Sequence, residues 1–78
     1  LDREGVYFEH EGNRAALVGR WKLVARGRRG SWELYDMEAD RTETRDLADQ
    51  YPGEVERLAS LWRDWAVRTQ VLPWPGGG

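Results

Sequence analysis

The sequence predicts an α+β fold, in which a four-stranded antiparallel sheet packs against one long C-terminal helix. Short strand-like segments alternate with glycine-containing turns in the N-terminal half, and apolar residues recur at three- and four-residue steps near the C-terminus. A chain of 78 residues is long enough for one small domain that buries roughly 60% of its unfolded surface. We assign residues 1–75 to that single domain and residues 76–78 to a flexible glycine tail.

The four strands are expected to follow one another as a meander. The first alternates and is rich in strand-favouring side chains, and Glu11-Gly12-Asn13 supplies the turn that ends it. Gly19-Arg20 separates the second strand from the third, and a charged tip with two glycines at 26–30 leads into the fourth. The predicted strands are residues 6–10, 15–18, 21–25 and 31–36.

The two-residue period of a strand assigns side chains to the faces of this sheet. Trp21, Leu23 and Ala25 share one face, which we expect to pack against the helix together with Trp32 and Leu34. The second face is more apolar than a solvated surface requires, so we expect this face, or a strand edge, to dock on another domain. The residues assigned to the second face are Tyr7, Ala16, Val18, Val24 and Tyr35.

The helix is predicted over residues 52–71. Pro52 suits a first helical turn because its missing amide hydrogen would have no partner there, and Glu54 and Glu56 favour the positive end of the helix dipole. Between the sheet and the helix, residues 37–50 are polar turn and cap residues with Leu47 as their apolar anchor. One apolar stripe is expected along the helix, formed by Val55, Leu58, Ala59, Trp62, Trp65, Ala66 and Thr69.

Composition excludes several classes of function. The absence of cysteine rules out disulfides, thiolate metal sites and a cysteine nucleophile in this chain. The formal net charge of −2, with acidic and basic residues interleaved, argues against nucleic-acid and anionic-membrane partners. No apolar run approaches the roughly 20 residues that cross a bilayer. Because the chain begins at Leu1 rather than methionine, we expect that it was cut from a longer protein, with any targeting signal upstream.

The candidate site residues lie at the first predicted turn. His10 stands between two glutamates, which suits a proton-transfer or anion-binding group, although a polar strand end without chemical role is the alternative. Asn13 and Arg14 are expected either to bind a substrate anion or to cap the turn and form a domain-interface ion pair, and we favour the interface role. The acidic series between residues 36 and 49 lacks the spacing of an EF-hand, so we assign it to turn capping and predict no metal site.

A series of short motifs in order along the chain resembles the C-terminal subdomain of bacterial arylsulfatases, in the sulfatase family of the alkaline-phosphatase-like superfamily. The resemblance extends over nearly the whole chain, including the tryptophan-rich helix. It is carried by residues 9–15 (EHEGNRA), 19–24 (GRWKLV), 32–36 (WELYD), 40–43 (DRTE) and 46–48 (DLA).

This resemblance implies a role in a larger enzyme. The partner would be the N-terminal catalytic domain of the same chain, which would hold a divalent metal (calcium) and a formylglycine. The turn of His10, Glu11, Asn13 and Arg14 would face that domain, at the substrate pocket or at the domain interface. The nucleophile motif, Cys-or-Ser-x-Pro-or-Ala-x-Arg, is missing here, so we expect no catalytic residue in this fragment and no activity from it alone. A bacterial periplasm or cytoplasm would be its location.

A second hypothesis belongs to another class of function. A free-standing module of this fold would use its uncovered sheet face or strand edge to bind a protein or a carbohydrate. The two hypotheses make different predictions for the coding sequence upstream of Leu1. A nucleophile motif there favours the sulfatase, whereas a natural start near Leu1 favours the free-standing module.

Overall fold

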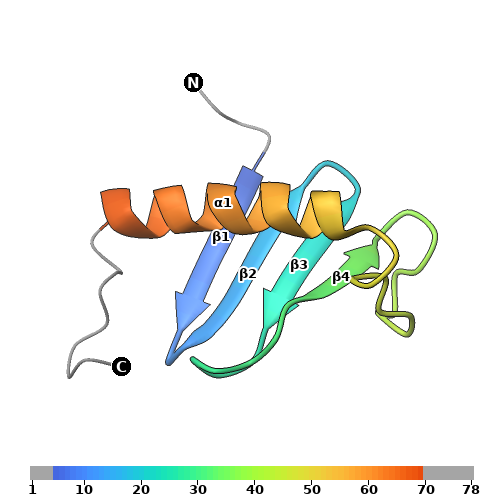
Figure 1. Cartoon of the computed structure of the whole chain (residues 1–78), viewed down its shortest axis with the longest axis horizontal. Coiled ribbons are helices and arrows are strands. Elements are labelled where there is room, and N and C mark those ends of the chain that lie inside the picture. The colour runs from blue at the N-terminus through green and yellow to red at the C-terminus, as the bar shows by residue number, and fades with distance from the viewer. Residues whose placement is uncertain (1–4, 70–78) are drawn as a thin grey trace.

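The fold is a four-stranded antiparallel meander crossed on one face by a single helix, as Figure 1 shows. The structure is a computed structural model that describes residues 5–69. Its elements confirm the predicted α+β architecture and the strand order β1-β2-β3-β4. They are β1 (Gly5–His10), β2 (Asn13–Val18), β3 (Trp21–Ala25), β4 (Glu33–Asp36) and α1 (Pro52–Arg68).

The predicted element boundaries need four corrections. β1 begins at Gly5 rather than at residue 6, because Gly5 still pairs with Val18. β2 begins at Asn13 rather than at residue 15, because the two-residue turn Glu11-Gly12 lets pairing continue to the His10–Asn13 pair. β4 begins at Glu33 rather than at residue 31. α1 ends at Arg68 rather than at residue 71, and the Thr69 hydroxyl donates to the Trp65 carbonyl at 2.8 Å. The assigned domain limits at 1 and 75 and the glycine tail at 76–78 lie outside the described residues.

The register shows which side chains lie under the helix. One row crosses all four strands, because Tyr7 pairs with Ala16, Ala16 with Leu23, and Leu23 with Leu34. Residues directly opposite each other in an antiparallel pair point to the same face of the sheet. Since Leu23 and Leu34 are fully buried beneath α1, Tyr7 and Ala16 are on the helix side as well.

The assignment of Tyr7, Ala16 and Val18 to the second face was therefore wrong. Val18 pairs with Trp21 across the Gly19-Arg20 turn, and both pack at the helix side. Val24 and Tyr35 do lie on the opposite face, as predicted. We call this opposite side the open face; besides Val24 and Tyr35 it carries Val6, Phe8, Ala15, Leu17 and Lys22.

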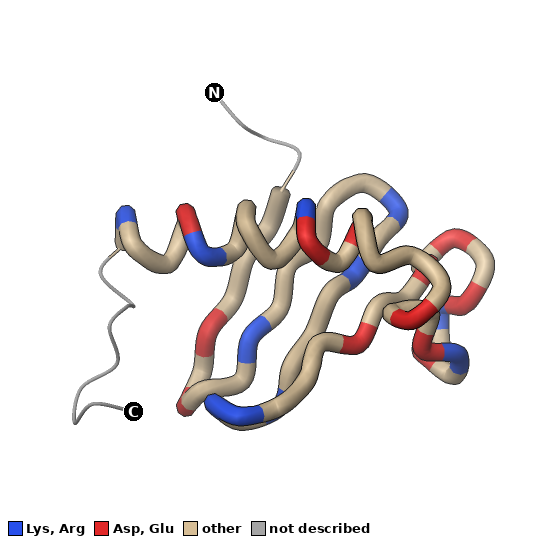
Figure 2. The backbone as a smooth tube through the Cα atoms, viewed as in Figure 1, with Lys and Arg blue, Asp and Glu red and all other residues tan. Residues whose placement is uncertain are grey.

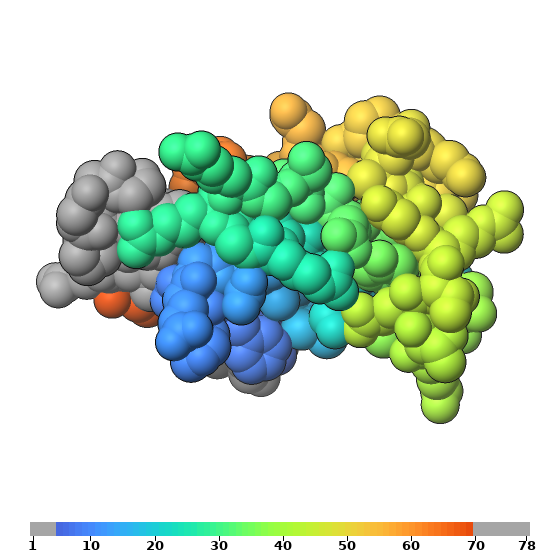
Figure 3. All heavy atoms as spheres, turned by 90° about the horizontal axis from the view of Figure 1, so that it is seen from below, coloured from blue at the N-terminus to red at the C-terminus, as the bar shows by residue number. Residues whose placement is uncertain are grey.

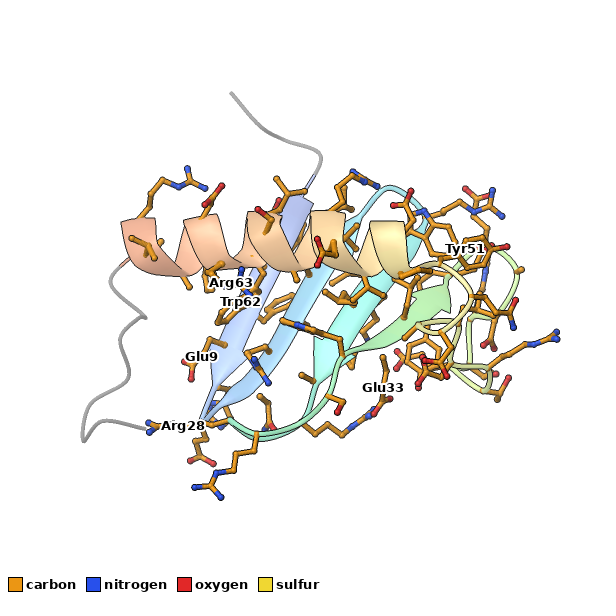
Figure 4. The ribbon with its side chains drawn as sticks, in the orientation of Figure 1. Glu9, Arg28, Glu33, Tyr51, Trp62 and Arg63 are labelled. Atoms are coloured by element: carbon orange, nitrogen blue, oxygen red, sulfur yellow. The ribbon has the colours of Figure 1, made fainter. Side chains whose placement is uncertain are left out.

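The core between α1 and the sheet is apolar and rich in aromatic rings. Trp62 points from α1 towards the sheet (Figure 4) and is 2% exposed. Its indole Nε1 donates to the Phe8 carbonyl at 2.8 Å, which ties the helix to the edge strand β1. The ring centroids of Trp62 lie 6.2 Å from Trp32 and 5.9 Å from Trp65, spacings typical of tilted and edge-to-face aromatic pairs.

The predicted stripe of α1 is confirmed apart from its C-terminal end. Leu58, Ala59, Trp62 and Ala66 are buried, and Val55 and Trp65 are half-buried against the core. Thr69 is exposed and follows the helix as its cap residue.

The polar segment between β4 and α1 folds back along the free edge of β4. The Leu47 amide donates to the Leu34 carbonyl at 2.7 Å, and Asp46 Oδ1 accepts from the Leu34 amide at 3.0 Å. Leu47 packs against the core, as expected of the apolar anchor. Figure 2 shows that acidic residues gather in this segment, while the strands are mostly uncharged. The segment thus covers one edge of the sheet with backbone-capping carboxylates.

Candidate functional site

The first predicted site residues, His10 and Glu11, lie at the tip of the β1–β2 hairpin. Glu11 and Gly12 both have positive φ, 53° and 89°, which is the conformation of a tight two-residue hairpin turn. His10 Nε2 lies 3.9 Å from Glu11 Oε1, and the two side chains are 81% and 82% exposed. The pair therefore projects from the end of the sheet into solvent.

Glu9, expected beside His10, takes a different role. It lies on the opposite face of the strand, and its Oε2 accepts a hydrogen bond from the Gly12 amide at 2.9 Å. One of the two carboxylates next to His10 in sequence thus caps the turn.

Asn13 and Arg14 join the β1–β2 turn to the loop between β3 and β4. Asn13 Oδ1 accepts from the Gly27 amide at 2.7 Å. Arg14 Nη2 donates to the carbonyls of Gly27 and Gly30 at 3.2 and 2.9 Å. The two tips lie side by side, as the blue and green segments of Figure 3 show. These two predicted site residues therefore brace both tips into one unit.

The guanidinium of Arg14 also lies over an aromatic ring. Its Cζ is 4.7 Å from the centroid of Trp32, within the range of a cation–π contact. Partial burial lowers the pKa of Arg14, and the nearby positive charge of Arg63 lowers it further. An arginine stays protonated at neutral pH despite such a shift, so the charge is retained at some desolvation cost.

The open face carries a shallow groove of about 640 Å³ that sequence reasoning did not predict. Its apolar floor runs across the middle strands, and its ends carry polar groups. Val6 and Phe8 of β1 are 52% and 53% exposed on this face, so they offer large apolar side chains to solvent. The lining residues are Phe8, His10, Asn13, Arg14, Ala15, Leu17, Lys22, Val24, Ala25, Arg26 and Glu43.

Two ion pairs border this groove. Lys22 Nζ contacts Glu43 Oε2, and both side chains are about three-quarters buried, which holds the segment after β4 against the open face. Arg26 Nη1 lies 2.7 Å from Glu33 Oε1, which also accepts from the Tyr35 hydroxyl at 2.6 Å. The hydrogen bond from Tyr35 lowers the pKa of Glu33 most, and the bond from Arg26 lowers it further. In return, the hydrogen bond to Glu33 raises the pKa of Tyr35 to about 12.

The described residues do not fit a divalent metal. Within residues 5–69 no three histidine or acidic side chains come together in a way that would hold an ion. Asp36, Asp40 and Asp46 instead accept backbone N–H groups in their own turns, which agrees with the predicted capping role. The sequence has no cysteine, and neither Ser31 nor Ser60 is followed by the proline or alanine and the arginine of the formylglycine motif.

Across residues 5–69, α1 is the only helix, and it is too short and too charged to cross a bilayer.

Comparison with known proteins relates the chain to sulfatases. No family model matches it. It is 31% identical over 71 residues to an uncharacterized sulfatase of Schizosaccharomyces pombe. The match takes in 87% of this chain but only 13% of the length of that fungal protein. The chain is thus distantly similar to one small part of a sulfatase, and we describe it as sulfatase-related.

Proposed function

We propose that this chain is the C-terminal subdomain of an arylsulfatase-like sulfuric ester hydrolase, where it supports the catalytic domain and has no activity alone. The observation that carries the proposal is the match itself. It takes in most of this chain yet only 13% of a sulfatase, as expected of one subdomain of a larger enzyme. The apolar open face supports it, because Val6 and Phe8 are more than half exposed next to each other on one strand.

The tip residues have two different roles in this proposal. Asn13 and Arg14 hold the two hairpin tips together through the carbonyls and amide of the 26–31 loop. His10 and Glu11 project into solvent from the tip so formed. In this proposal they are the residues of the segment that would reach the substrate pocket. The divalent metal, calcium, and the formylglycine belong to the catalytic domain, where they would supply charge stabilisation and the nucleophile.

The test starts from the coding sequence upstream of Leu1. We expect a Cys-or-Ser-x-Pro-or-Ala-x-Arg motif and metal-binding aspartates there, and hydrolysis of an aryl sulfate such as p-nitrophenyl sulfate by the full-length protein. The 78-residue chain alone should release no sulfate. In the full-length enzyme, His10→Ala should alter KM or kcat, whereas Arg29→Ala, an exposed residue of the neighbouring tip, should not. An upstream frame without the motif would refute the sulfatase assignment.

The groove on the open face also suits a second function, a free-standing module that binds a protein or carbohydrate. An apolar floor with polar ends is a common form of binding site. This alternative predicts that the gene starts near Leu1 and that the isolated chain binds its ligand without any sulfatase domain.

A further inference from the structure

The open face differs from the rest of the described surface in its large apolar side chains. Within residues 5–69, the large hydrophobic residues with high exposure are Val6, Phe8, Tyr51 and Val67. Two of these four, Val6 and Phe8, lie next to each other on the same side of β1. Their cross-strand partners are Leu17 and Ala15, so the four side chains form one continuous apolar surface, which we call the β1–β2 surface.

The charged groups beside the β1–β2 surface already have partners within the chain. Lys22 is paired with Glu43, and Arg26 with Glu33. A partner that covers the surface therefore does not have to supply a buried counter-charge, which would carry a large desolvation cost. An apolar centre bordered by satisfied polar groups is the usual composition of a protein interface.

We propose that the catalytic domain of the same polypeptide docks on the β1–β2 surface, an inference that rests on the proposed function. Two observations select this occupant. The chain matches only 13% of a sulfatase, so the greater part of such an enzyme lies outside the matched region and is available as a partner in the same polypeptide. β1 is the first strand of residues 5–69 and Val6 stands near its start, so a domain that precedes this chain would be connected close in sequence to this surface.

A tethered domain also suits the size of the surface. Four side chains make a small patch, and a separate protein would need a larger one to bind stably. A covalent connection replaces bimolecular association by docking at high effective concentration, so a smaller apolar contact is sufficient.

The experiment places a charge on the β1–β2 surface of the full-length enzyme. Val6→Lys and Phe8→Lys are compared with Val67→Lys, which makes the same change at a valine that is 59% exposed on α1. The readout is the half-life of sulfatase activity at a fixed inactivating temperature. Urea unfolding of the same three variants in the 78-residue chain measures any effect that is intrinsic to this domain.

We expect Val6→Lys and Phe8→Lys to shorten the half-life of the full-length enzyme about tenfold, because each buries an unpaired charge in the docked interface. Val67→Lys should stay within about twofold of wild type, and in the 78-residue chain the three variants should unfold at similar urea concentrations. Equal half-lives for all three full-length variants would overturn the docking site. So would equal losses in the isolated chain and the full-length enzyme, which would make the effect one of folding.

Two further outcomes identify other occupants. If the isolated chain dimerises and Phe8→Lys makes it monomeric, the β1–β2 surface binds a second copy and the proposal is overturned. Failure of the proposed function is recognised separately, because it appears as a missing nucleophile motif or a full-length protein without sulfatase activity before any variant is made. The docking proposal fails on its own when the full-length enzyme is active and indifferent to a lysine at residue 6 or 8.

Discussion

Replacing Arg14 by methionine should loosen the contact between the two hairpin tips. The wild-type guanidinium donates to the carbonyls of Gly27 and Gly30 and lies over Trp32. Methionine keeps an apolar chain of similar length above the ring but removes both hydrogen bonds and the charge. The variant therefore isolates the polar part of the brace.

The structure sets the size of the effect. A hydrogen bond from a charged donor contributes about 1.5–3 kcal/mol in a buried setting, and a partly exposed cation–π contact about 0.5–1 kcal/mol. Arg14 is only partly buried, and its lowered pKa shows that desolvation and the charge of Arg63 oppose these gains. We therefore expect a loss of about 2 kcal/mol in the free energy of unfolding, which is below the sum of these contributions because the site is only partly buried.

Urea unfolding followed by tryptophan fluorescence measures this loss. With a slope of about 1 kcal/mol per molar urea for so small a domain, the midpoint should fall by about 2 M. Arg29→Met serves as the matched control, because Arg29 is an exposed arginine of the 26–31 loop. Arg14→Lys should recover little, since both carbonyls accept from Nη2 and the lysine nitrogen ends one bond short of that position. If Arg14→Met and Arg29→Met shift the midpoint equally, the brace contributes nothing and our account of Arg14 is wrong.

Three further predictions concern stability. Gly12→Ala should lower the free energy of unfolding by about 1 kcal/mol or more, because φ is 89° and a Cβ would lie 2.8 Å from Arg28 Cγ. Gly53→Ala, with open space around it, should raise the free energy of unfolding by about 0.5 kcal/mol, and paired urea curves test both changes. Leu58→Ala should cost about 3 kcal/mol in the same assay, since Leu58 is fully buried, and a cost below about 1 kcal/mol would show that the core repacks. Backbone amides lower the pKa of Asp40, so its stabilising contribution is present above about pH 4 and is lost as pH falls through the depressed value. Asp40→Asn should accordingly lose less stability than wild type between pH 5 and pH 2, and parallel pH profiles would refute this.

The type of each element could be predicted because it depends on local sequence. The face of the sheet on which each side chain lies could not, because it depends on how successive strands pair. The two-residue turns after β1 and β2 exchange odd and even positions between faces, and the β3–β4 pairing does the same across a longer loop. Odd residues of β1 and β3 therefore share the helix side with even residues of β2 and β4. Placing Leu23 against the helix therefore required placing Ala16 there too. The lengths of the first two turns carry this information for β1 to β3, whereas the two-residue period of a single strand does not, and the face of β4 depends on the pairing across the longer loop.

The site was less predictable than the fold because its contacts join segments far apart in the chain. Asn13 and Arg14 were selected as a possible interface pair, and the structure shows them bonded to Gly27 and Gly30. These residues are far apart in the sequence, so the contact could not be predicted from local patterns. It forms because the β1–β2 turn and the β3–β4 loop lie at the same end of the strands. Their roles towards a substrate or a partner domain stay predictions.

The position of α1 decides which apolar side chains stay exposed. A single helix covers one face of a sheet, and here Trp62 fixes it to β1 through the Phe8 carbonyl. The same residue, Phe8, directs its side chain to the other face, where it is 53% exposed. Full burial of an exposed phenylalanine contributes about 1.5–3 kcal/mol, so covering the exposed half of this ring would add about half of that, against the roughly 4–12 kcal/mol expected for a domain of this size. A partner that covers the open face would thus stabilise the domain by a smaller amount than the Arg14 brace does, and at a residue that the brace does not touch.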